Sequence, residues 1–168
     1  MNTSKTITLT IAGLVAIAIV LLIIQLLLKK LKPKSEIDGR LKLSYGIWFV
    51  TLFIAASIVN SKTISVLSEA IDNIYKMNIP NMLGESAKAT SLFIGLGIVW
   101  FVVWFYIANL LAVIIVGKRI DSNEMESDNR SYFLIKGFLV IGFMLCLLPI
   151  FEILLRVFMP SVEIPFYH

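Results

Sequence analysis

Two charged residues stand inside an apolar stretch close to the C-terminus, and they are the first candidates for chemistry. Glu152 and Arg156 are four residues apart with the acid first, which is the favourable order for an ion pair along one helix face. Pro149 precedes them and cannot donate a backbone hydrogen bond, so we expect the helix to kink there. The pair is interpreted either as self-satisfied at the outer interface, or as a charged constriction or a proton-accepting carboxylate next to the kink.

The segment WFVVWFY, residues 100–106, places aromatic side chains deep in another apolar stretch. Tryptophan in membrane proteins is usually found at the lipid–water interface. At the rise of an α-helix, however, Trp100 and Trp104 share a face roughly 14–20 Å inside this stretch. We expect them, with Tyr106, to pack on another helix of this chain or of a partner, and a lipid or quinone site is the alternative. Asn109 is expected to hydrogen-bond across a helix interface or to contact a substrate.

Composition excludes several kinds of catalytic site. The single histidine is His168 and the single cysteine is Cys146, so paired-histidine haem sites, multi-histidine zinc sites and thiol–disulfide relays lack their ligands. The sequence also has no glycine-rich phosphate loop and no nucleophile elbow. We therefore predict no catalytic residue, no metal and no cofactor. Cys146 is expected to be a small buried hydrophobe.

The elements that must position these residues are predicted from the apolar content. Hydrophobic residues make up 58% and charged residues 15% of the chain, against about 45–50% and about 25% in soluble domains. A helix needs about 20 residues to cross a bilayer, and a membrane-spanning backbone must form either helices or a closed barrel. The sequence therefore predicts an all-α membrane protein in one domain, with four transmembrane helices at residues 7–28, 43–60, 91–117 and 132–158.

Residues 61–79, between the second and third predicted spans, have the pattern of an amphipathic helix. Apolar residues recur at steps of three and four, with polar residues on the other faces. We expect this helix to lie in the outer interface or to continue the second span beyond the lipid. Its apolar face would either cover the protein's own helices or meet a partner subunit, and that face consists of Ile64, Leu67, Ile71 and Ile74.

The distribution of Lys and Arg predicts the orientation. Ten of the 15 basic residues lie in or beside residues 29–42 and 118–131. By the positive-inside rule these two loops are expected in the cytoplasm, with both termini outside. The net charge of +4 then reflects this bias together with contact to membrane lipid, and no nucleic acid partner is expected. Ile- and Lys-rich composition with short loops suggests a bacterial inner membrane.

A short charged pattern occurs twice, as EIDGR at residues 36–40 and ESDNR at residues 126–130. Each copy follows one apolar run and precedes the next, so we interpret the chain as two repeated helical hairpins in parallel orientation. The acidic residues are expected to cap the following helix, and the arginines to reach carboxylates or lipid phosphate. A cytoplasmic docking site or gate is the alternative. The motif residues are Glu36, Asp38, Arg40, Glu126, Asp128 and Arg130.

These observations favour a non-enzymatic subunit of a larger membrane complex. It would dock through the deep aromatic residues and the outer amphipathic helix, either with other membrane subunits or with copies of itself. The first alternative is a small homo-oligomeric channel or transporter with its pathway near Glu152 and Pro149. The second is lipid or quinone binding near Trp100 and Trp104.

Overall fold

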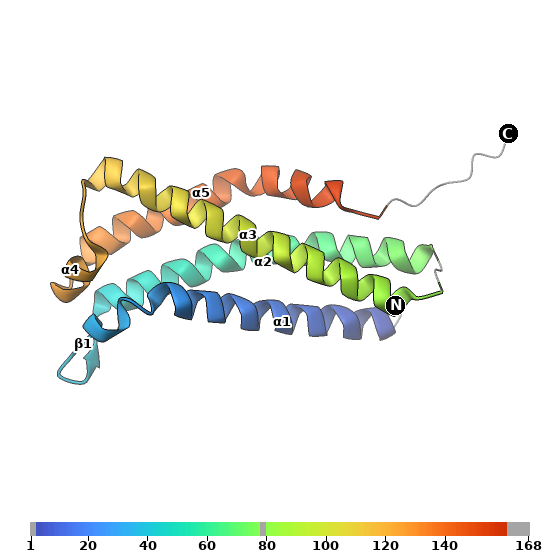
Figure 1. Cartoon of the computed structure of the whole chain (residues 1–168), viewed down its shortest axis with the longest axis horizontal. Coiled ribbons are helices and arrows are strands. Elements are labelled where there is room, and N and C mark those ends of the chain that lie inside the picture. Colours follow the sequence, from blue (N-terminus) through green and yellow to red (C-terminus); the bar gives the residue numbers. More distant parts are fainter. Residues whose placement is uncertain (1–2, 78–79, 161–168) are drawn as a thin grey trace.

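The computed structural model describes residues 3–77 and 80–160, and these residues are almost entirely helical (Figure 1). Within those ranges four helices are long and apolar enough to cross a membrane, by length and composition. They confirm the predicted helical architecture with four helices that could span a membrane. The four helices are α1 (Thr3–Leu28), α2 (Leu43–Lys76), α3 (Met82–Val116) and α5 (Arg130–Val157).

Helix α2 is longer than predicted because it absorbs the amphipathic segment. Residues 61–76 do not form a separate helix but continue the second span without a break, which was one of the two expected arrangements. No Gly or Pro occurs between Gly46 and Pro80, so nothing in the sequence interrupts the helical hydrogen bonds. Residues 78 and 79 of the predicted element lie outside the described residues.

Helix α3 begins earlier than the predicted start at residue 91. The side chain of Asn81 accepts a hydrogen bond from the amide of Gly84 at 3.2 Å, so this asparagine caps the helix. Gly84 lies in the first turn of α3. Helix α5 continues through Pro149.

The two connectors lie at one end of the bundle, here called the connector end (Figure 1). The first contains a short 3-10 helix, η1 (Lys32–Lys34), and a hairpin of β1 (Glu36–Ile37) with β2 (Arg40–Leu41). Asp38 and Gly39 form its turn, both with positive φ, a combination that Asp-Gly favours. The second connector contains α4 (Asp121–Glu126). The all-α prediction anticipated neither the hairpin nor α4, and the two copies of the charged motif differ in secondary structure.

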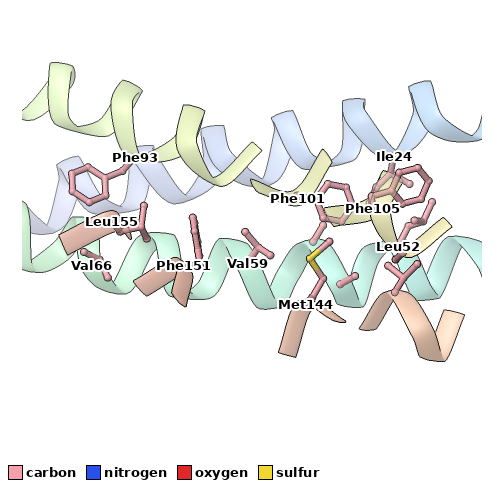
Figure 2. Packing of buried hydrophobic residues seen from close by; sticks show 14 of the residues in the cluster. Ile24, Leu52, Val59, Val66, Phe93, Phe101, Phe105, Met144, Phe151 and Leu155 are labelled. Atoms are coloured by element: carbon pink, nitrogen blue, oxygen red, sulfur yellow. The ribbon is translucent and has the colours of Figure 1, made fainter. Parts of the chain in front are cut away.

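The core lies where the four long helices face one another (Figure 2). Helix α2 packs against each of the other three, and its strongest association is with α5. Figure 2 shows Leu52, Val59 and Val66 of α2 in one layer with Phe93 and Phe101 of α3, together with Met144, Phe151 and Leu155 of α5. Dispersion and close packing hold such a core together, because lipid is as apolar as the side chains themselves.

Two glycines allow α2 to approach its neighbours closely. A Cβ placed on Gly97 of α3 would lie 2.7 Å from Oγ1 of Thr63, and one on Gly137 of α5 would lie 2.5 Å from Oγ1 of Thr51. Both threonines are buried on α2. Small residues at helix interfaces allow this approach in membranes. Gly97 therefore lies at a close helix contact, whereas a Cβ on Gly95 would meet nothing within 4 Å.

We predict that Gly137→Leu destabilises the bundle by about 1–3 kcal/mol, because overpacking forces neighbouring side chains and backbone to shift. The measurement is the unfolding transition of the full chain in detergent micelles. Gly142→Leu is the matched control on the same helix, where a Cβ would meet nothing within 4 Å. Equal effects of the two substitutions would contradict the close approach of α2 and α5.

Candidate functional site

A row of serines lies on an exposed face of α2. Ser57, Ser61 and Ser65 follow one another at four-residue steps and are all exposed. In the described part of the chain, none of their hydroxyls has a hydrogen-bond partner. They line an open hollow of about 570 Å³ beside α5, together with Lys62 of α2 and Leu148 of α5.

One end of this hollow carries ion pairs that join α2 to α5. Nζ of Lys62 lies 2.8 Å from Oε2 of Glu152, and both side chains are 29% exposed. Arg156 also binds Glu152, at 2.9 Å, and reaches Glu69 of α2 at 2.8 Å. Glu152 is therefore neutralised from two sides. We call the three serines with Lys62 and Glu152 the polar seam.

The deep tryptophans pack within the chain. Trp100 stacks on Phe151 of α5 with ring centroids 5.0 Å apart, and Trp104 lies 5.5 Å from Trp100. Tyr106 points to a different face, where it is 58% exposed. The side chain of Asn109 donates to the carbonyl of Phe105 at 2.7 Å, within its own helix. The predicted aromatic docking face is therefore not one surface. Trp100 and Trp104 pack within the chain, and Tyr106 is exposed on another face of α3.

The apolar face of the amphipathic segment is also used internally. Leu67 and Ile71 are completely buried and Ile74 is 2% exposed, all within the common core, while Ile64 is partly buried. This matches the interpretation in which the segment covers the protein's own helices. It leaves these buried side chains no surface for a partner.

The two charged motifs meet at the connector end, but they act differently from each other. Oδ1 of Asp128 accepts a hydrogen bond from the amide of Ser44 at 2.9 Å, so it caps α2 and not the helix that follows it. Asn129 caps α5 instead, by accepting from the amide of Tyr132. Asp38 sits in the hairpin turn. The prediction that each acidic residue caps its own following helix is therefore wrong.

Charged contacts fasten the second connector to the first. Glu126 binds Lys34 at 2.7 Å, and Nζ of Lys42 donates to the carbonyls of Lys34 and Glu126. The lysine at position 34 holds the pKa of Glu126 below its ordinary value. Asp38, Arg40, Asp128 and Arg130 line one open hollow there, so the structure brings the two motifs together.

A buried lysine forms a second polar cluster at the connector end. Lys136 of α5 is 4% exposed, and its Nζ lies 2.6 and 2.7 Å from the two carboxylate oxygens of Asp121. The hydroxyl of Tyr132 donates to the same carboxylate at 2.6 Å. The ammonium group also lies 5.0 Å from the centre of the Trp48 ring, a cation–π distance. The cluster lines a cavity between α1 and α3.

Sequence reasoning did not single out the serine row or the partners of Lys136. The four-residue spacing of Ser57, Ser61 and Ser65 is visible in the sequence and could have identified the row. Asp121 could not be paired with Lys136 in the same way, because their contact depends on α4. Cys146, expected to be buried, is exposed.

Neither a protein-family model, nor a curated protein, nor a solved structure matches this chain. Among the described residues no group of three or more His, Cys, Asp or Glu side chains is placed to hold a metal ion. The candidate sites therefore rest on geometry alone.

We predict that Asp128→Ala destabilises the chain by about 2 kcal/mol, through loss of the helix cap and through strain at a left-handed position. Its φ of 49° is a conformation that Asp and Asn tolerate better than Ala. Asp128→Asn keeps an acceptor oxygen and should retain most of the stability. Unfolding of the full chain in micelles provides the measurement. Asp38→Ala is the control, because φ is also 49° there but no helix is capped.

The pH dependence of the stability provides a second test of the helix cap made by Asp128. The hydrogen bond from the Ser44 amide holds the pKa of Asp128 below its ordinary value of 3.8, with a smaller contribution from Arg130. A depressed pKa in the folded state contributes stability above pH 3.8 that is lost as the pH falls through the folded pKa. The stability difference between the natural chain and Asp128→Asn should therefore narrow in acid. A difference that does not change with pH would contradict the ionised cap.

Proposed function

We propose that this chain is a non-enzymatic subunit of a membrane complex, and that a transmembrane helix of another subunit packs along the polar seam. The observation that carries the proposal is the row of exposed serines next to the partly buried pair of Lys62 and Glu152. Polar side chains that face lipid are costly, whereas a packed helix can hydrogen-bond to them.

The depth of the seam supports this proposal. Lys136 and Trp48 lie at one level, because they are in contact. Counting from them at the rise of an α-helix, Ser57 lies about 14 Å and Ser61 about 20 Å along α2, and Arg156 lies about 30 Å along α5. A hydrocarbon layer about 30 Å thick between the levels of Lys136 and Arg156 would hold both serines. The seam then lies inside the lipid.

The spacing of the serines suits a helix as the occupant. Small residues at four-residue steps let a second backbone approach closely, as in small-xxx-small interfaces. The seam carries one cation and one anion that already pair, so the partner needs no opposite charge. We place the connector end in the cytoplasm, on the basis of its Lys and Arg content, in a bacterial inner membrane.

The channel alternative uses the same surface. If several copies surrounded the seam, its hydroxyls would line a pathway and Glu152 would face it. Pairing of Glu152 with both Lys62 and Arg156 favours a structural over a proton-accepting role. Ion flux through the purified, reconstituted chain would favour a pathway over a dry helix interface.

We predict that a cysteine at position 61 cross-links to the partner helix in native membranes. The experiment uses the full chain with Cys146→Ser and Ser61→Cys, a thiol cross-linker and analysis of the product mass. Val99→Cys is the matched control, because Val99 is 60% exposed on α3, away from the seam. The cross-linked fraction should be several-fold higher at position 61 than at position 99.

A second measurement decides between the docking proposal and an unpartnered chain. Extraction in a mild detergent should give a complex with fixed stoichiometry that Ser61→Trp disrupts, because a large side chain fills the space of the docked helix. A monodisperse monomer, together with equal cross-linking at positions 61 and 99, would contradict the proposal.

A further inference from the structure

We propose that the cavity between α1 and α3 at the connector end binds an anionic phospholipid, with the headgroup at its basic end and the acyl chains along its apolar walls. The inference does not depend on the polar seam, which lies on other helix faces. It rests on the shape of the cavity, on its two-part lining and on its place along the bundle.

The cavity opens where two helices separate. Helices α1 and α3 approach each other near Ala16 and Gly97, which line a common pocket, and they diverge toward the connector end (Figure 1). The space between them there has a volume of about 690 Å³. This is within the range of roughly 300–1,000 Å³ of small-molecule sites.

The walls of the cavity are apolar on the side that faces the membrane. Leu26 of α1 and Leu110 of α3 are each 68% exposed, and Val113 lies one turn beyond Leu110. Tyr106 contributes an exposed aromatic ring to the same wall. Hydrocarbon chains entering from the bilayer would contact these side chains without losing water.

The end of the cavity near the connectors is basic. Three cationic side chains line it, Lys30, Arg119 and Lys136, and among the lining residues Asp121 is the one carboxylate. Lys136 and Tyr132 already donate to Asp121, so its negative charge is compensated. Lys136, which pairs with Asp121, lies over the Trp48 ring, and these three residues line the basic end of the cavity.

Lys30 and Arg119 remain available for a ligand phosphate. Lys30 is exposed and forms no ion pair within the described residues. Arg119 uses one terminal nitrogen, Nη1, to bind Glu124 at 3.2 Å and keeps its other donors free. Lys30 follows the end of α1 and Arg119 follows the end of α3, so two cations flank the basic end of the cavity. Basic pockets between transmembrane helices at this level bind acidic lipid headgroups.

The test is binding of phosphatidylglycerol to the full chain in detergent, measured by native mass spectrometry with phosphatidylcholine as the neutral comparison. Lys30→Gln with Arg119→Gln should weaken phosphatidylglycerol binding by roughly tenfold or more, because each basic group near a headgroup contributes to the affinity. Lys29→Gln with Lys118→Gln is the matched control. It removes the same charge from neighbouring positions that do not line the cavity.

Two further measurements distinguish lipid binding in the cavity from non-specific attraction of the lipid to positive charge. Val113→Trp keeps every cation and should still abolish most binding, because it fills the apolar slot. Inorganic phosphate at millimolar concentration should not displace the lipid. Equal binding of the two lipids, equal losses in both double variants, displacement by phosphate, or preference for an uncharged quinone would each overturn the proposal. Melting temperatures close to that of the natural chain confirm that the variants are folded.

Discussion

The close approach of α2 to two neighbouring helices is the contact on which the rest of the structure depends. Thr63 meets Gly97 of α3 and Thr51 meets Gly137 of α5, at distances where any larger residue than glycine would force a shift. Inside lipid, burial of apolar surface does not by itself hold helices together, so such packing must do it. Both contacts are on α2, which therefore organises the other helices around itself.

A central α2 explains how its faces are used. Its apolar side chains from Leu52 to Ile74 turn toward α1, α3 and α5 and become the core. The serines at positions 57, 61 and 65 then face outward, and their hydroxyls have no hydrogen-bond partner among the described residues. The same arrangement places Lys62 beside Glu152, so an acidic side chain on α5 is matched by a base on α2. One helix thus supplies the core, the ion pair and the exposed polar seam.

The sequence predicted the four long helices, but it missed some local features and every contact that needs a distant partner. The four helices followed from uninterrupted apolar length. The sequence left open whether residues 61–76 continue the second span, although no Gly or Pro between residues 47 and 79 interrupts the helix. The hairpin at Asp38 and Gly39 was not predicted, although it has a local signal, because Asp-Gly favours the turn it forms. By contrast, Asp128 caps a helix 84 positions earlier in the chain, and Lys136 finds Asp121 only because α4 forms. Periodicity carries no information about either contact.

A disulfide across the α2–α3 contact tests this central role most directly. An ideal Cβ on Gly97 lies 3.7 Å from Cβ of Thr63, and disulfides join Cβ atoms about 3.5–4.5 Å apart. With Cys146→Ser, the pair Thr63→Cys and Gly97→Cys should oxidise to an intramolecular disulfide in membranes, seen as the loss of two hydrogens in the intact mass. The pair Thr63→Cys and Gly95→Cys should stay reduced. Oxidation of the Gly95 pair in preference to the Gly97 pair would show that α2 does not pack as described.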